Sequence, residues 1–140
     1  MSKNTILIVD DEPDVVAYLS EILDSSDYNL FTTDNAVNGL KLAEEIHPDL
    51  ICLDIMMPAE SGLTMYSKLR RISGLKKTPV LIISGMEQKQ DFDFKKYVDD
   101  DKIPPPDGYF EKPIDVNHFR DEVERLLAAR KKRKKEGHSS

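Results

Sequence analysis

Four short apolar runs of the chain are each followed by side chains that could carry chemistry. These side chains are Asp10 and Asp11, Asp54, Ser84 and Lys112. Crowded carboxylates repel one another and require a compensating cation, and oxygen ligands favour Mg²⁺. A carboxylate beside Mg²⁺ and an ammonium can attack phosphorus to form an aspartyl phosphate. Each residue alone would more simply be a helix cap, a turn residue or a surface charge, so the prediction depends on their convergence.

The elements that must position these residues alternate along the chain. Apolar runs predict five strands, at residues 5–9, 28–33, 50–53, 79–83 and 109–110. Apolar residues at three- and four-residue steps predict helices at residues 13–23, 36–46 and 61–72, and from about Asp115 onward. This alternation predicts an α/β fold, in which a doubly wound five-stranded parallel sheet is the middle of three layers. Ligands bind at the carboxyl ends of such strands, where all of these side chains are expected.

Charge divides the chain into two parts. The net charge of −6 combines −11 over residues 1–129 with +5 over residues 130–140. An acidic body is a poor match for phosphate backbones, so we expect no direct nucleic-acid binding from the domain. We predict one domain over residues 1–130 and a basic tail or linker stub over residues 131–140.

No part of the chain predicts a membrane segment or a disulfide. The apolar runs are far shorter than the roughly 20 residues needed to cross a bilayer, and the start lacks a signal-peptide core. Cys52 is the only cysteine, so it is expected to be a small buried apolar residue. We therefore expect a cytoplasmic protein.

The order of the motifs resembles the receiver domain of two-component response regulators. The matching segments are Ile8 to Pro13, Asp54 to Pro58 with Gly62 and Leu63, Ile83 to Gly85, and Lys112 with Pro113. Each motif is weak alone, but the ordered set at successive strand ends is specific and covers about residues 4–130. The resemblance implies a flavodoxin-like sheet with the strand order 2-1-3-4-5.

The resemblance also implies a phosphoacceptor and a metal site. Asp54 resembles the phosphoacceptor of the family. Mg²⁺ is implied as the cofactor, held by Asp11, Asp54, the backbone carbonyl of Met56 and, partly through water, Asp10. These residues form the predicted metal site.

Three further residues have implied roles in catalysis and switching. Ser84 resembles the hydroxyl that moves onto the phosphoryl group, and Lys112 resembles its ion-pair partner. Tyr109 resembles the aromatic switch residue that turns inward. The resemblance also predicts a cis peptide bond between Lys112 and Pro113.

The implied function is that of a signalling switch rather than of a turnover enzyme. The chain would take a phosphoryl group from a phosphohistidine of a sensor histidine kinase or a phosphotransfer protein. The modification would shift an existing equilibrium and change a surface that binds a downstream target. The sequence leaves the oligomeric state open, and a homodimer is one of the alternatives.

The chain departs from the family pattern in three places. Gly85 stands where the family often has Ala, which is expected to be tolerated. Ser84 and Lys112 are 28 positions apart, and the excess lies in an insert at Asp99 to Pro106, which is either a bland loop or an output contact individual to this protein. Met56 and Met86 cannot orient an attacking water, which predicts slow self-dephosphorylation.

Other functions match the sequence less well. A phosphohydrolase of the haloacid dehalogenase type needs an Asp-x-Asp pattern after the first strand, where this chain has Asp10-Asp11-Glu12. A flavodoxin-like FMN carrier needs a Gly- and hydroxyl-rich phosphate loop at the same place. A phosphorylation-independent pseudo-receiver, used only for docking, remains the alternative.

Overall fold

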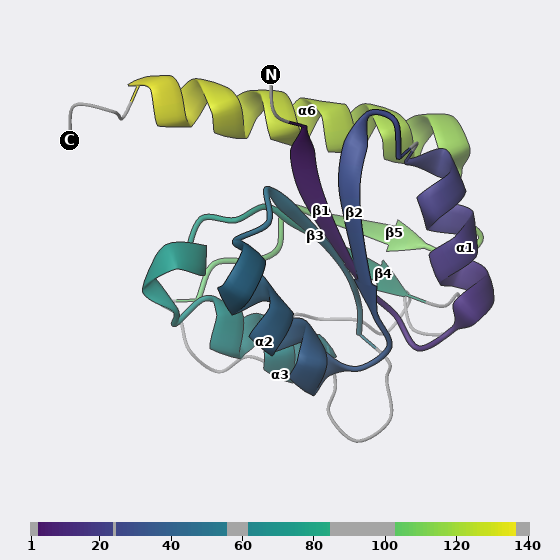
Figure 1. Cartoon of the computed structure of the whole chain (residues 1–140), viewed down its shortest axis with the longest axis horizontal. Coiled ribbons are helices and arrows are strands. Elements are labelled where there is room, and N and C mark those ends of the chain that lie inside the picture. The colour runs from purple at the N-terminus through teal and green to yellow at the C-terminus, as the bar shows by residue number, and fades with distance from the viewer. Residues whose placement is uncertain (1–2, 24, 56–61, 85–102, 137–140) are drawn as a thin grey trace.

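The structure, a computed structural model, describes residues 3–23, 25–55, 62–84 and 103–136. Within these residues strands and helices alternate along the chain (Figure 1). The elements are β1 (Asn4–Val9), α1 (Pro13–Ile22), β2 (Tyr28–Thr33), α2 (Ala36–Ile46), β3 (Leu50–Asp54), α3 (Gly62–Leu69), the 3₁₀ turn η1 (Ser73–Leu75), β4 (Val80–Ser84), β5 (Gly108–Glu111) and α6 (Val116–Glu136).

The strands form one parallel sheet in the order β2-β1-β3-β4-β5. This order confirms the predicted α/β fold. β3 and β4 are buried along their whole length, as expected for central strands covered on both faces. β2 lies at one edge and alternates between more and less exposed positions, so its side chains contribute less to the core.

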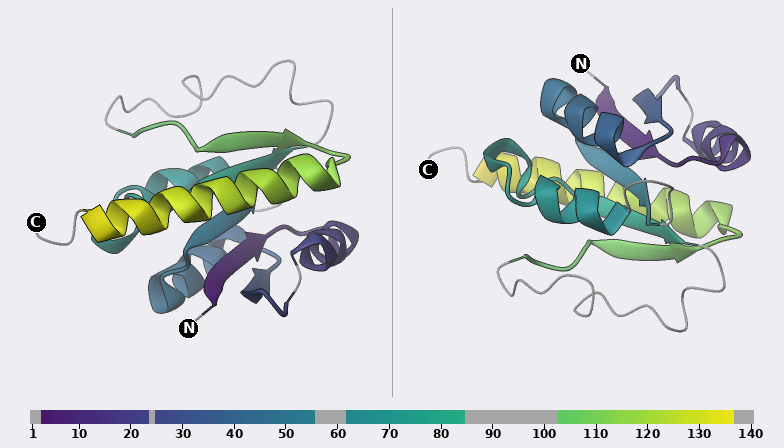
Figure 2. Two further views of the ribbon diagram at one scale, coloured as in Figure 1. Left: turned by 90° about the horizontal axis from the view of Figure 1, so that it is seen from above. Right: turned by 90° about the horizontal axis from the view of Figure 1, so that it is seen from below.

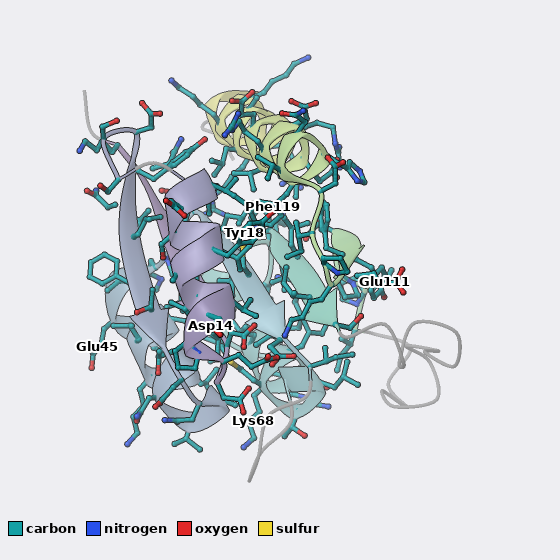
Figure 3. The ribbon with its side chains drawn as sticks, turned by 90° about the vertical axis from the view of Figure 1, so that its right-hand side faces the viewer. Asp14, Tyr18, Glu45, Lys68, Glu111 and Phe119 are labelled. Carbon is teal, nitrogen blue, oxygen red and sulfur yellow. The ribbon has the colours of Figure 1, made fainter. Side chains whose placement is uncertain are left out.

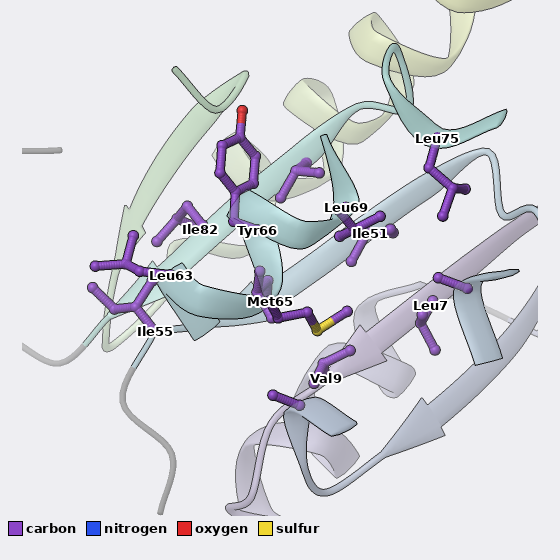
Figure 4. Packing of buried hydrophobic residues seen from close by; sticks show 14 of the residues in the cluster. Leu7, Val9, Ile51, Ile55, Leu63, Met65, Tyr66, Leu69, Leu75 and Ile82 are labelled. Carbon is purple, nitrogen blue, oxygen red and sulfur yellow. The ribbon is translucent and has the colours of Figure 1, made fainter. Parts of the chain in front are cut away.

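Helices lie on both faces of the sheet (Figure 2). Beneath them, side chains on the two faces build two separate apolar clusters. Alternate residues of one strand point to opposite faces, so Leu7 and Ile8 on β1 join different clusters. The cluster under α2 and α3 includes the residues in Figure 4, among them Val9, Met65 and Leu69. The cluster under α1 and α6 includes Leu19, Leu23, Cys52, Phe110, Phe119 and Val123.

One predicted helix end was wrong. The apolar spacing predicted a helix over residues 61–72, but α3 ends at Leu69. The N–H groups of Arg71 and Ile72 donate to carbonyls three residues earlier, at 3.1 Å each, and η1 follows. The helix ends here because the backbone of Ile72 is extended, with φ −87° and ψ 123°.

The guanidinium of Arg70 is buried and makes contacts in several directions. It donates to the carbonyl oxygens of Leu75 at 3.1 Å and Thr78 at 2.7 Å, and its Nε donates to the Tyr66 hydroxyl at 3.1 Å. It also forms an ion pair of 3.5 Å with Asp107. The side chain thus joins α3, the turn before β4 and the residue before β5.

Three further hydrogen bonds fix the chain before β5. The Val80 N–H donates to the Asp107 carboxylate at 2.8 Å, and the Asp107 N–H donates to the Val80 carbonyl at 3.0 Å. The hydroxyl of the buried Tyr66 donates to the Pro104 carbonyl at 2.7 Å. Pro104, in the C-terminal part of the predicted insert, is therefore fastened to α3, and Asp107, just after the insert, is fastened to β4.

Helix α6 has 21 residues and extends beyond the strands at its C-terminal end (Figure 2). Its largely buried Arg130 forms an ion pair of 3.6 Å with Asp49, whose carboxylate also accepts the Thr5 N–H at 2.8 Å. Arg130 thus belongs to the folded body, whereas residues 131–133 are exposed. In the part of the chain that the structure describes, no helix is both long and apolar enough to cross a membrane.

Candidate functional site

The parallel sheet brings the predicted site residues to one edge. Asp10 follows the last residue of β1, and Asp54 is the last residue of the adjacent β3. Ser84 is the last residue of β4, and its carbonyl accepts the Lys112 N–H at 2.8 Å. The convergence expected from the sequence is therefore present.

Four carboxylates form a cluster at this edge. Oxygens of Asp10, Asp11, Glu12 and Asp54 all lie within 4.8 Å of one another. Asp10 and Asp54 are each only 2% exposed, whereas Asp11 is half-buried and Glu12 is exposed. Such an all-oxygen set with a solvent-facing side suits a hard divalent cation that keeps several waters.

The buried carboxyl of Asp10 is held from two sides. Its Oδ1 accepts the Glu12 N–H at 2.9 Å, and its Oδ2 faces the Lys112 ammonium at 3.4 Å. Burial raises the pKa of Asp10, although the Glu12 N–H and the Lys112 charge oppose that shift. Among the described residues Oδ2 accepts no hydrogen bond. An additional cation at the cluster would satisfy this oxygen.

Lys112 supplies a positive charge to the cluster. Its Nζ lies 2.7 Å from a Glu12 carboxylate oxygen, 3.4 Å from Asp10 and 3.9 Å from Asp54. Burial alone would lower the pKa of Lys112, but the bond to Glu12 and the charges of Asp54 and Asp10 raise it overall. The ammonium therefore stays charged at neutral pH.

The segment after Lys112 is fixed against α1. The Lys112–Pro113 peptide bond is cis, which confirms the prediction. The hydroxyl of Tyr18 on α1 donates to the Ile114 carbonyl at 3.0 Å. Tyr18 and the buried Phe119 of α6 lie on the same side of the sheet (Figure 3). The Tyr18 hydrogen bond thus ties the segment that follows Lys112 to α1.

A cleft adjoins the acidic cluster. It has a volume of about 590 Å³ and is lined by Asp10, Asp11, Pro13, Val16, Ala17, Thr32, Thr33 and Asp34. It lies beside Asp11, between α1 and the carboxyl end of β2. The cluster is therefore accessible from this side.

The two predicted switch residues differ in exposure. Ser84 is buried, whereas the Tyr109 side chain on β5 is 46% exposed. Tyr109 pairs in register with Ile82, two residues before Ser84 on the neighbouring strand. The two residues thus belong to adjacent strands near the site, and their switching role stays a prediction.

Several predicted features lie outside the described residues. These are the Met56 carbonyl, Gly85, Met86 and the first part of the insert, residues 99–102. Sequence reasoning also assigned no role to Glu12, although it belongs to the cluster and makes the shortest contact to Lys112. The sequence feature that could have identified Glu12 is its position directly after the Asp10-Asp11 pair.

Comparisons with known proteins agree with this geometry. A family model described as the response regulator receiver domain matches residues 6–124. The chain is 34% identical over 126 residues to the DNA-binding dual master transcriptional regulator RpaA of a Synechocystis species, covering 87% of this chain and 48% of RpaA. It is 28% identical over 129 residues to the polar-differentiation response regulator DivK of Brucella ovis, covering 91% of this chain and 98% of DivK.

A solved structure shares the fold. The chemotaxis protein CheY4 of Vibrio cholerae superposes with a TM-score of 0.72 at 23% identity, over 89% of this chain and 99% of that one. The chain thus spans about half the length of RpaA but nearly all of DivK and CheY4. With the receiver family model matching most of its length and its sheet in the expected order, this chain belongs to the response regulator receiver domain family.

Proposed function

We propose that this receiver takes a phosphoryl group from a phosphohistidine onto Asp54, with Mg²⁺, and thereby switches a partner-binding surface. The observation that carries the proposal is the buried Asp54 carboxylate, grouped with three other carboxylates and 3.9 Å from the Lys112 ammonium. This set combines a nucleophile with the charges that phosphoryl transfer requires.

The proposed step is a direct displacement at phosphorus. An oxygen of Asp54 attacks the phosphorus, a new O–P bond forms, and the P–N bond to the donor histidine breaks. The imidazole nitrogen leaves with the bonding electron pair and takes up a proton from solvent. Lys112 then lies close enough to neutralise part of the charge on the transferred group.

The residues of the cluster fit a magnesium ion. Asp11 and Asp54 would hold it directly, and Asp10 partly through water, with the Met56 carbonyl as the remaining proposed ligand. The bound ion would offset the negative charge between the carboxylates and the incoming phosphate. The half-buried Asp11 is the cluster member that lines the open cleft together with Asp10.

The proposed switch couples this site to β4 and β5. A phosphoryl group adds about −1.5 to −2 charges and strong acceptor oxygens. The Ser84 hydroxyl and Lys112 would move toward these oxygens, and Tyr109 would turn inward as Ser84 moves. The resulting surface change would be recognised by a downstream target, with a sensor histidine kinase or a phosphotransfer protein as the phosphodonor.

The experiment is an intact-mass measurement after incubation with a small-molecule phosphodonor, with and without Mg²⁺. The parent is compared with Asp54→Asn, which keeps the side-chain shape, and with Asp34→Asn, which removes an exposed carboxylate lining the same cleft. We expect a gain of one phosphoryl group in the parent and in Asp34→Asn, dependent on Mg²⁺. Asp54→Asn should show none.

Two results would contradict the proposal. A phosphoryl group retained by Asp54→Asn would place the modification elsewhere. A folded parent that neither gains mass nor responds to Mg²⁺ in an NMR titration would instead favour the docking-only pseudo-receiver.

A further inference from the structure

We propose that Glu12 holds the Lys112 ammonium in a resting position, which Lys112 must leave when Asp54 carries a phosphoryl group. Glu12 would thus be a positioning residue that lowers the stability of the phosphorylated state. The inference rests on the proposed function, because it assumes that Asp54 is the phosphoacceptor.

The distances around Lys112 show which carboxylate its ammonium binds in this structure. Its Nζ makes a hydrogen bond of 2.7 Å to Glu12, while Asp10 at 3.4 Å and Asp54 at 3.9 Å lie beyond a good hydrogen bond. The short contact therefore goes to the outermost carboxylate of the cluster and not to the proposed phosphoacceptor. Lys112 must shift inward to bind oxygens attached to Asp54.

The backbone of Glu12 explains why its side chain reaches Lys112. Glu12 is the N-cap residue of α1, but its side chain makes no capping bond to the helix. Its carbonyl accepts the N–H groups of Val15 and Val16 at 3.1 Å each, and its own N–H donates to Asp10. The backbone is thus fixed by the turn, and the carboxylate is directed to Lys112.

The ion pair between Glu12 and Lys112 is partly exposed to solvent, so it can open at a small cost in free energy. The Glu12 side chain is 57% exposed, whereas that of Lys112 is 19% exposed. A pair with one well-solvated partner has a small net free energy, because water replaces the lost contact. The contact can therefore bias the position of Lys112 without locking it.

The competition has a measurable consequence. A phosphoryl group on Asp54 and the Glu12 carboxylate compete for one ammonium, so removing the Glu12 charge should favour the phosphorylated state. From the usual strength of exposed ion pairs, the expected gain in affinity for a phosphoryl mimic is about two- to fivefold.

The test uses beryllofluoride, which mimics a phosphoryl group on a carboxylate, at saturating Mg²⁺. Its affinity is measured by NMR titration for the full chain, Glu12→Gln and Asp14→Asn. Asp14 is exposed on the first turn of α1, so Asp14→Asn removes one negative charge from the same region as a matched control (Figure 3). The signals of the Lys112 side chain are recorded without beryllofluoride as a second readout.

The expected result is tighter beryllofluoride binding by Glu12→Gln, with Asp14→Asn close to the parent. The Lys112 side-chain signals should shift in Glu12→Gln alone. Equal or weaker binding by Glu12→Gln, or the same gain in Asp14→Asn, would overturn the role of Glu12 while leaving the proposed function intact. Failure of the parent to bind beryllofluoride at Asp54 would overturn both.

Discussion

Gly62 packs directly against the backbone of Asp54. A Cβ added at Gly62 would lie 2.1 Å from the Asp54 carbonyl oxygen and 2.8 Å from the Cα of Ile55. The Gly62 N–H also donates to the Ile55 carbonyl at 3.3 Å. The first residue of α3 therefore rests on the end of β3, and only glycine allows this approach.

Gly62→Ala should displace Asp54, because backbone atoms cannot move aside as a flexible side chain can. We expect a loss of about 1–3 kcal/mol in the free energy of unfolding, and slower phosphorylation of Asp54. Urea denaturation and intact mass measure the two effects. Gly74→Ala is the control, because among the described residues its Cβ would meet the side chain of His47 and no backbone atom. Equal behaviour of the two variants would contradict the prediction.

Magnesium should stabilise the folded chain. Ligand that binds only the folded state at 100 times its Kd adds about 2.7 kcal/mol to the free energy of unfolding. We expect this gain in the parent, its loss in Asp11→Asn, and its retention in Asp34→Asn, whose carboxylate lies outside the acidic cluster. Denaturation with and without a chelator measures it. A full Mg²⁺ effect in Asp11→Asn would argue against the proposed ligand.

Replacing Arg70 by Met should strongly destabilise the fold. The change leaves the Thr78 and Leu75 carbonyls and the Asp107 carboxylate without their buried donor. We expect a loss of about 2–4 kcal/mol in the free energy of unfolding. Arg120→Met, on the exposed side of α6, should change it by less than about 0.5 kcal/mol. A loss of similar size in both variants would refute a special role for Arg70.

Cys52 should be unreactive in the native state. Burial raises the pKa of its thiol to about 12, so at pH 8 only about one thiol in ten thousand is the reactive thiolate. Alkylation followed by mass measurement should label the protein only after unfolding.

The raised pKa of Cys52 also makes the stability of the fold depend on pH. Because the thiol pKa is higher in the folded state than in the unfolded state, raising the pH above about 8.5 favours unfolding. Labelling under native conditions should therefore increase only at high pH. Stoichiometric labelling of the native protein at pH 8 would show that Cys52 is accessible.

The central strands of the sheet could be predicted because they are buried on both faces. The runs at residues 50–53 and 79–83 match β3 and β4 to within one residue, since continuous burial leaves few alternatives for short apolar segments. The end of α3 could not be predicted in the same way. It lies where Arg71 and Ile72 bond to carbonyls three residues earlier and the backbone of Ile72 becomes extended, which apolar spacing does not encode.

The site residues could be proposed because each follows an apolar run. The parallel sheet then brings Asp10, Asp54, Ser84 and Lys112 to one edge, whatever the detailed packing. The contact of Glu12 with Lys112 was missed because it joins residues 100 positions apart through side-chain direction alone. The spacing of residues along the sequence does not predict such a contact.

The direction in which the residues at the end of helix α6 point is fixed relative to the sheet. The ion pair between Arg130 and Asp49 attaches the helix to the folded body. The helical backbone then continues through the basic run to Glu136. Each residue of an α-helix turns the chain by about 100°. Any group joined in continuous helix after Glu136 would thus face a direction set by the sheet. Inserting one residue within 131–135 would rotate that group by about 100°, whereas inserting seven would nearly restore its direction and move it about 10 Å outward.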